Sequence, residues 1–361
     1  MSKKVGLIIA GAGARIPQEL ALIYHLIEEK GLEPTVLTGT SSGSLSSVFL
    51  NGVLQNKAGK GNLSWDMLKN ILFNLSNDDI YKSSALLNQK NDQNLKQILG
   101  TIEDLISDKG LGEILDGIKL VWESAKDQKS LGEVLSAIAD AWKNGYFFDT
   151  APLKDTLTQY VNGDNYIGYA TFGECYLPTY ISAVDDVSGK TQRFFSKNQD
   201  DAQFNPVDIL LASTAIPVAF PARSVGGTAY IDGGTATDDI PVEDMIQDGF
   251  FDQVYIVAPQ NTGLITGNAH TFVNASLLSN ALFAIDVSQG AIVPFQLARA
   301  MNLVQDKSKA FYYSPILSKS YSLLDFTGQV LMEQFNESLD WARANDPKVI
   351  KDFLPEIGFP V

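Results

Sequence analysis

The chain has 361 residues, of which 45% are apolar, so it can form one large domain or two ordinary ones with a buried core. Its net charge of -15 argues against a nucleic-acid partner and against simple electrostatic adsorption to anionic lipid. The single cysteine, Cys175, excludes an intrachain disulfide framework and a cysteine metal site.

No apolar run approaches the roughly 20 residues of a membrane-spanning helix, so any contact with a membrane is expected to be peripheral. The apolar run that follows Lys3 and Lys4 is about half as long as a signal peptide and ends at a glycine-rich stretch. We interpret it as a first strand. We therefore expect a protein that is cytoplasmic or exported without a cleavable signal peptide.

The first predicted strand covers residues 4–10 and leads into the glycine-rich residues 11–15. A helix follows, because Pro17 suits its first position, apolar residues repeat with a helical period, and Gly31 closes it. A second strand begins at residue 35 and leads through a Gly/Ser turn into another helix. This order predicts a right-handed crossover and a parallel sheet in an α/β domain.

Residues 39–43 read G-x-S-x-G between the second strand and its helix. In that context the tight turn holds the serine in a strained backbone conformation and projects its hydroxyl beside the helix N-terminus. Gly39 and Gly43 remove side chains that would collide where strand and helix cross. We interpret Ser41 as a nucleophile. For the pentapeptide alone, a chance Gly/Ser turn is the alternative.

Residues from about 55 to 147 are polar and helical in pattern, and residues 111–122 resemble residues 131–142. Two copies are too few for a solenoid, so we predict a helical pair in an insertion. Their apolar stripes either pack on the domain or form a lid over an apolar substrate.

The pattern returns to strands between residues 166 and 195, with a turn at residues 185–190. A helix is predicted at residues 207–212, then an irregular loop with two prolines, and a short strand at residues 228–231 that stops at Asp232. Residues 251–258 form another apolar strand. We expect the remainder to be mainly helical, most clearly at residues 294–303 and 324–343.

A serine hydroxyl needs a neighbouring base to act as a nucleophile. Asp232 ends a strand, and Gly233 and Gly234 after it let the backbone turn sharply and leave the carboxylate facing a cleft. Partial shielding from water would raise its pKa toward a useful range. His25, in the first helix, is expected to be a surface or packing histidine. His270, in a Gly/Asn/Thr-rich loop, leaves a Ser-Asp-His arrangement open.

Gly11, Ala12 and Gly13, here called the glycine turn, precede a helix N-terminus. Their backbone N–H groups can converge on an oxyanion. The spacing matches neither the dinucleotide nor the Walker phosphate pattern. Arg15 either braces this turn, meets a substrate phosphate, or is a solvated helix-start residue. Residues 235–241 after Asp232 contain two adjacent aspartates, Asp238 and Asp239. We expect these carboxylates to lie in a solvated loop rather than to form a cation site.

Four blocks, residues 11–15, 39–43, 212–217 and 232–234, resemble in this order the signature blocks of the patatin-like phospholipases, and residues 148–153 are similar to another block. The resemblance spans roughly residues 4–260. It implies a three-layer α/β/α fold with a mostly parallel central sheet. We expect a catalytic domain over residues 1–260 with a helical insertion at about 55–147. Residues 261–361 are then a mainly helical part packed on the same domain.

The resemblance implies a lipid acyl hydrolase of the phospholipase A or lysophospholipase type, which forms an acyl-enzyme and uses no cofactor and no metal ion. Ser41 would be the nucleophile, Asp232 the base and the glycine turn the oxyanion hole, with Arg15 and the four glycines flanking the dyad in supporting roles. Ala12 stands where the family has glycine, so it requires a negative φ.

The expected partners are a membrane phospholipid or lysophospholipid as substrate, and an activating protein of the kind that some bacterial relatives need. We expect no nucleic acid, and peripheral attachment to membranes during activity. Two alternatives remain open. One is an acyltransferase or a His270-dependent esterase, and the other is a non-catalytic relative that binds lipid or a protein partner.

Overall fold

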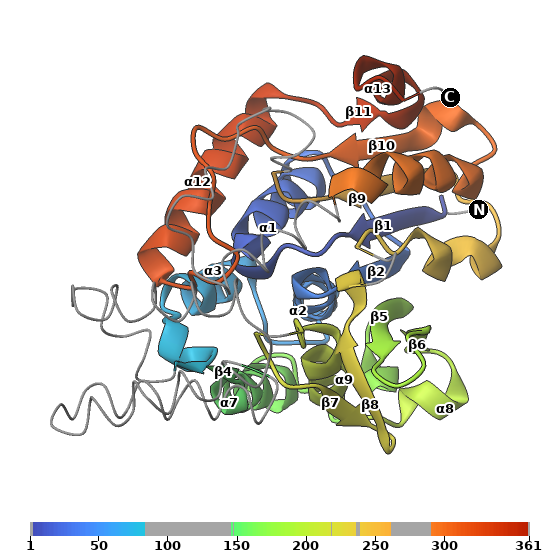
Figure 1. The fold of residues 1–361 in the computed structure, drawn as a ribbon. Coiled ribbons are helices and arrows are strands. Elements are labelled where there is room, and N and C mark those ends of the chain that lie inside the picture. Colours follow the sequence, from blue (N-terminus) through green and yellow to red (C-terminus); the bar gives the residue numbers. More distant parts are fainter. Residues whose placement is uncertain are drawn as a thin grey trace, which may run out of the picture.

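The computed structural model describes residues 3–83, 146, 148–217, 219–235, 239–260 and 290–359. A nine-stranded sheet runs through the molecule in the order β11, β10, β9, β1, β2, β5, β8 and β7, and β6 also pairs with β5 (Figure 1). Its strands are β1 (Val5–Ile9), β2 (Val36–Thr40), β5 (Thr179–Asp185), β6 (Thr191–Phe195), β7 (Arg223–Val225), β8 (Thr228–Asp232), β9 (Gln253–Val257), β10 (Ala310–Tyr313) and β11 (Lys348–Val349).

The centre of the sheet is parallel and its margins are antiparallel. The pairs of β1 with β2, β1 with β9, β9 with β10, and β2 with β5 are parallel, whereas β6, β7, β8 and β11 join antiparallel. A separate two-stranded sheet joins β3 (Lys82–Ser83) and β4 (Phe148–Asp149). The predicted parallel centre of the sheet is therefore confirmed, and the sheet as a whole is mixed.

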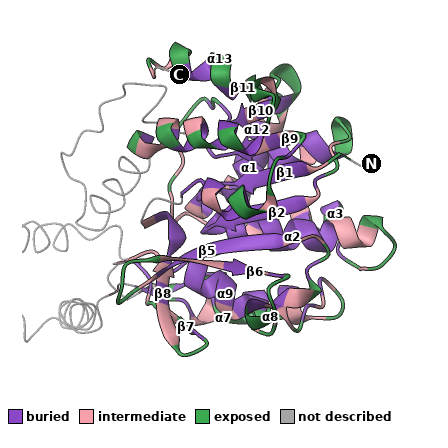
Figure 2. Ribbon diagram, turned by 90° about the vertical axis from the view of Figure 1, so that its right-hand side faces the viewer, coloured by how far each residue is buried: buried purple, intermediate pink, exposed green. Residues whose placement is uncertain are grey.

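Helices cover both faces of this sheet, which makes three layers (Figures 1 and 2). β1 shows why: Leu7 and Ile9 belong to one apolar core, while Ile8 and Ala10 belong to the other. A strand that is buried on both faces reads as a continuous apolar run, as residues 4–10 do. The predicted three-layer α/β/α fold is confirmed.

The first core is covered by α1 (Ile16–Tyr24), α2 (Ser42–Lys57), α3 (Trp65–Phe73), α7 (Ala151–Leu157), α9 (Pro206–Ser213) and α12 (Gly328–Ala344). The second core is covered by η7 (Val242–Asp248), a helix over residues 290–300 and α13 (Ile350–Glu356). Shorter helical turns are η1 (Gly13–Arg15), a π-helix η2 (His25–Glu29), η3 (Asn77–Asp79), a π-helix η4 (Thr158–Asn162), η5 (Phe172–Glu174), α8 (Gln199–Ala202), η6 (Gly233–Thr235), η8 (Met301–Leu303) and η9 (Lys307–Lys309).

Two strands share one edge of β5. Along the opposite edge, β5 pairs with β6 over residues 180–184. On the shared edge, β2 runs parallel and pairs Thr40 with Ser182, and β8 runs antiparallel and pairs Asp232 with Ala183. The C-terminal ends of β2 and β8 thus meet head to head over two adjacent residues of β5. This arrangement brings the residue after Thr40, Ser41, close to Asp232.

One expectation about secondary structure was wrong. Strand structure resumes only at Thr179, because the preceding residues form turns and η5. In the described part of the C-terminal segment most residues are helical, and the strands β10 and β11 also extend the sheet there. The predicted helical pair at residues 111–142 lies outside the described residues, and the division into domains stays a prediction.

Candidate active site

Ser41 occupies the sharp turn between β2 and α2. Its φ of 54° and ψ of -128° make it the only described non-glycine residue with a positive φ. Such a conformation costs about 1–3 kcal/mol and persists only where the surroundings impose it. A Cβ on Gly39 would lie 2.2 Å from the carbonyl oxygen of Gly43, and one on Gly43 would lie 2.3 Å from that of Ala10. Both glycines are therefore required where α2 crosses the sheet.

Asp232 lies at the end of β8 and is 3% exposed. The Gly234 N–H donates to its Oδ1 at 2.8 Å, while Oδ2 meets no donor of ordinary hydrogen-bond geometry among the described residues. Burial raises the pKa of this carboxyl to about 6, and the Ser41 hydroxyl and the Gly234 amide act in the opposite direction. The structure thus brings Ser41 and Asp232 together, in a place with little water.

Gly233 has a separate reason to be glycine. A Cβ there would lie 2.5 Å from the carbonyl oxygen of Ser182 on β5. The turn after Asp232 can therefore fold back against β5 only without a side chain at this position.

The glycine turn offers fewer free donors than the sequence predicts. The Gly11 N–H donates to the Asp239 carbonyl at 3.0 Å, and the Ala12 N–H donates to the Ser42 Oγ at 2.8 Å. Among the described residues, the Gly13 N–H has no acceptor. The φ of Ala12 is -140°, so its methyl group fits where the family has glycine. Gly13 does need its lack of a side chain, because its φ is 54°.

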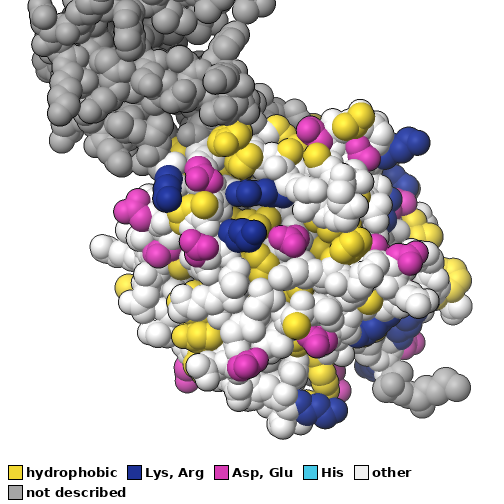
Figure 3. All heavy atoms as spheres, turned by 90° about the horizontal axis from the view of Figure 1, so that it is seen from below, with side chains coloured by type: hydrophobic (Ala, Val, Ile, Leu, Met, Phe, Trp, Pro, Cys, Tyr) yellow, Lys and Arg dark blue, Asp and Glu magenta, His cyan; other side chains and the backbone are white. Residues whose placement is uncertain are grey.

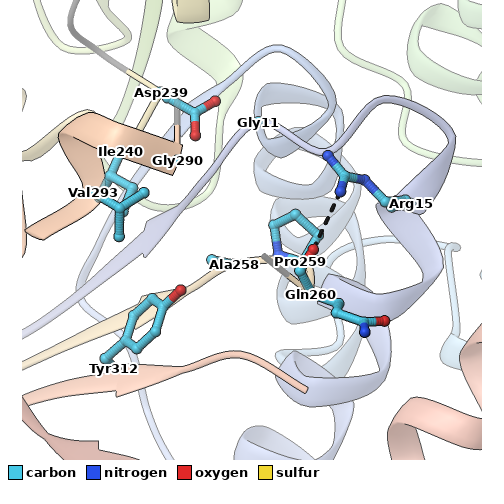
Figure 4. A pocket seen from close by; sticks show the side chains of 10 residues that line it. All are labelled: Gly11, Arg15, Asp239, Ile240, Ala258, Pro259, Gln260, Gly290, Val293 and Tyr312. Atoms are coloured by element: carbon cyan, nitrogen blue, oxygen red, sulfur yellow. Dashed lines mark hydrogen bonds between the residues drawn. The ribbon is translucent and has the colours of Figure 1, made fainter. Parts of the chain in front are cut away.

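Arg15 is buried rather than solvated. Its Nε donates to the Ala12 carbonyl at 3.3 Å and its Nη1 to the Gln260 carbonyl at 3.2 Å. It lines a cavity of about 20 Å³ together with Gly11, Asp239 and Tyr312 (Figure 4). That volume has room for about one water molecule. These contacts fit the first role predicted for Arg15, which is to brace the glycine turn.

Asp239 is a residue whose place the sequence did not predict. The acidic segment was expected to be solvated, and this is wrong for Asp239, which is 7% exposed and faces the same cavity (Figure 4). Its carboxyl lies against Gly11, since a Cβ on Gly11 would be 2.6 Å from Oδ1. Burial and the nearby Asp239 raise the pKa of the buried Glu19 carboxyl well above its usual range.

α12 and the segment before it hold the glycine turn from the outside. The Ala14 N–H donates to the Leu323 carbonyl at 2.8 Å, and the Ala14 carbonyl accepts from the Gln334 side chain at 3.1 Å. The Gln18 amide donates to the Gln334 Oε1 at 2.9 Å and accepts from the Gln260 N–H at 2.8 Å. These buried amides tie residues from both ends of the sequence to one turn.

The described histidine is not part of this constellation. His25 follows α1 at the end remote from the glycine turn, and its Nδ1 contacts Glu29 Oε2 at 2.6 Å. Its ring packs on Tyr313. His25 is therefore a packing residue, as expected, and His270 lies outside the described residues.

The family model described as patatin-like phospholipase matches residues 7–246, more than half of the chain. The chain belongs to this family. Membership supports lipid hydrolase activity. No curated protein matches the sequence significantly.

Two solved structures resemble the chain only distantly. VipD from Legionella pneumophila is 14% identical, with 95% of this chain and 67% of that chain covered and a TM-score of 0.34. ExoU from Pseudomonas aeruginosa, solved in complex with SpcU, is 14% identical, with 82% and 53% covered and a TM-score of 0.31. The chain thus spans about half the length of ExoU.

Two negative findings concern the described residues of this patatin-like chain. They contain no group of three or more His, Cys, Asp or Glu side chains placed to hold a metal ion. None of their helices has the length and apolar character needed to cross a membrane.

Proposed function

We propose that this protein is a lipid acyl hydrolase that cleaves carboxylic esters with a Ser41-Asp232 dyad. The observation that carries the proposal is the head-to-head placement of β2 and β8, which sets the strained Ser41 beside a buried carboxyl whose pKa is raised to about 6. A base with a pKa near the operating pH is suited to take the proton of a nucleophile. The favoured substrates, from the family, are phospholipids or lysophospholipids.

In the first step, the Ser41 Oγ attacks the ester carbonyl carbon and its proton passes to Asp232. The tetrahedral intermediate collapses, the ester C–O bond breaks, and the leaving alcohol takes the proton from Asp232. In the second step, water attacks the acyl-enzyme with Asp232 again as base, and the fatty acid and free Ser41 result.

The oxyanion donors would come from two helix starts. The Gly13 N–H has no acceptor among the described residues, and the first N–H groups of α2, beginning with Ser42, have none within the helix. We propose these as the primary donors, because preorganised amides are worth most where charge develops in a site with little water. Gly11 and Ala12 would then shape the turn through the contacts that their amides already make.

Ser41→Ala tests this function. Mixed phospholipids are incubated with wild type, with Ser41→Ala and with Asp232→Asn, and the products are profiled by lipidomics. Both variants are expected to lose essentially all release of fatty acid. Retention of hydrolysis by Ser41→Ala would contradict the proposal.

One observation favours a second candidate, a non-catalytic lipid-binding or partner-binding role. Two of the three amides predicted for the oxyanion hole already have acceptors within the protein. A fluorophosphonate probe separates the two candidates. Labelling of wild type that disappears in Ser41→Ala excludes the non-catalytic role. Labelling that appears only in a cell lysate would instead indicate the activating protein expected from the family.

Action at a membrane surface is a further part of the proposal. Acidic and basic side chains are interspersed on the face in Figure 3, so this face offers no broad basic area for anionic lipid. Co-sedimentation with neutral phosphatidylcholine vesicles and with anionic vesicles compares apolar with electrostatic attachment to the membrane. We expect anionic lipid to increase the bound fraction of the protein little.

A further inference from the structure

Ser213 lies at the end of α9 and its side chain is completely buried. Its Oγ accepts a hydrogen bond from the Ser41 N–H at 3.0 Å and donates one to the Ser182 carbonyl at 2.7 Å. A serine hydroxyl has one proton to donate, and this proton is committed to β5. The lone pair that faces Ser41 is therefore fixed in direction by the sheet.

The same segment also holds the other half of the dyad. Two residues after Ser213, the carbonyl of Ala215 accepts the Asp232 N–H at 2.9 Å. Ser182 pairs with Thr40 and its neighbour Ala183 pairs with Asp232. Residues 213–215 thus contact the backbone of the nucleophile, the backbone of the base and the strand that lies beside both.

We propose that Ser213 is a positioning residue that holds the strained turn at Ser41 and so fixes the distance between the nucleophile and its base. This inference rests on the proposed function. Ser213 does not touch substrate in this account. It acts through the backbone amide of Ser41.

The need for such a residue follows from the backbone at Ser41. A serine relaxes away from a positive φ unless its surroundings over-determine that conformation. At Ser41 the carbonyl side is held by the N–H of Ser44 at 3.0 Å and by its hydroxyl at 2.5 Å. On the amide side, Ser213 Oγ is the acceptor. Removal of this oxygen releases one side of the turn while the helix still holds the other.

Ser213→Ala tests the inference, and the chain offers a matched control. Ser196 is also buried, and its Oγ also accepts a backbone N–H, that of Thr179 at 2.9 Å. Thr179 begins β5, so this bond lies at the end of the strand remote from the dyad. Ser196→Ala therefore removes an equivalent hydrogen bond without a contact to the site.

We expect Ser213→Ala to lower kcat by roughly tenfold or more with little change in KM, because small misplacements of reacting groups reduce the rate strongly. Ser196→Ala is expected to keep kcat within about twofold. The hydroxyl of Ser41 lowers the pKa of Asp232, so a displaced Ser41 moves the acid limb of the kcat/KM profile to higher pH. Ser213→Thr keeps the hydroxyl and is expected to restore most of kcat.

Three results would overturn the inference: equal kcat in Ser213→Ala and Ser196→Ala, a loss confined to KM with an unmoved acid limb, or a Ser213→Thr variant as slow as Ser213→Ala. Circular dichroism and thermal unfolding verify folding. If Ser213→Ala does not fold, Ser213→Cys provides the same comparison with a weaker acceptor. Ser41→Ala is assayed in parallel, because its residual activity reports failure of the proposed function, independently of Ser213.

Discussion

The carboxyl of Asp232 connects the geometry of the site with its pH dependence. Burial raises its pKa from 3.8 to about 6. A general base must be ionised before the nucleophile reacts. We therefore expect kcat/KM for a neutral or zwitterionic lipid to rise with pH through about 6 and then to level off, as a pH-rate profile would measure. A profile that is flat from pH 4.5 to 8 would contradict Asp232 as the base.

The same shift predicts an effect on stability of Asp232→Asn. Because the folded state binds the proton more tightly than the unfolded state does, ionised Asp232 is unfavourable to folding above pH 6. Asp232→Asn is expected to raise the free energy of unfolding at pH 8, by up to about 3 kcal/mol, while abolishing hydrolysis. The gain should shrink as the pH falls through 6 and vanish near 3.8. Urea unfolding at several pH values measures it.

Asp185 provides a control of opposite sign. Its carboxyl accepts the N–H groups of Val187 and Ser188, which lower its pKa, so its ionised form favours folding. Asp185→Asn is therefore expected to lose stability at pH 8 rather than gain it. A loss in Asp232→Asn of the same sign would contradict the burial argument.

At the residue scale, local sequence predicted part of the site. Ser41, Asp232 and the glycines around them lie in short motifs, so the sequence indicates both the residue and the turn. Ser213 stood in a recognised block without a role, and Asp239 stood in a segment expected to be solvated. Their contacts join residues that are far apart in the chain, and no local pattern contains that information.

At the scale of elements, the crossing of α2 over the sheet depends on the small size of Gly43. An added Cβ would lie 2.3 Å from the carbonyl oxygen of Ala10 and 2.4 Å from that of Ile9, the last residue of β1. We expect Gly43→Ala to lower the free energy of unfolding by about 3 kcal/mol or more and to abolish activity, because backbone atoms cannot move aside cheaply. Chemical unfolding and probe labelling measure both effects.

Gly31→Ala separates this clash from ordinary strain. Gly31 has a φ of 70°, and an added Cβ would meet nothing within 4 Å. Its replacement is expected to cost only about 1–2 kcal/mol and to leave the activity unchanged. Equal losses in the two variants would show that close approach at Gly43 is not what requires glycine.

The strands that the sequence did not predict in the C-terminal segment, β10 and β11, are short, and β11 lies at the edge of the sheet. β10 has four residues and β11 has two, so neither is long enough to show the alternation of apolar and polar residues that marks a strand. β1, β2, β5, β8 and β9 were predicted because apolar runs or glycines mark them. The parallel order at the centre followed from the alternation of strands and helices, whereas the antiparallel margins depend on tertiary contacts.

At the scale of the whole molecule, the site extends beyond the segment that defines the family. The match ends at residue 246, but Gln334 on α12 bonds both Gln18 and the Ala14 carbonyl. Gln334→Met keeps the size of the side chain and leaves two buried groups without a partner. We expect a loss of about 1–3 kcal/mol in stability for each group and a lower kcat.

Gln329, on the same helix, serves as the comparison because it is exposed. Gln329→Met should change neither stability nor kcat by more than the error of unfolding and steady-state measurements. If Gln334→Met behaves in the same way, residues beyond 246 do not support the glycine turn.

The head-to-head meeting of β2 and β8 has a mechanical consequence. The last residue of β2, Thr40, pairs with Ser182 of β5, and the last residue of β8, Asp232, pairs with the adjacent Ala183. Because both strand ends are attached to neighbouring residues of β5, a twisting or bending motion of the whole sheet displaces them together. Such a motion therefore changes the distance between Ser41 and Asp232 little. The distance between nucleophile and base is sensitive instead to a distortion of the peptide link between Ser182 and Ala183. Tolerance to change should therefore be high across most of the sheet and low at this one peptide link.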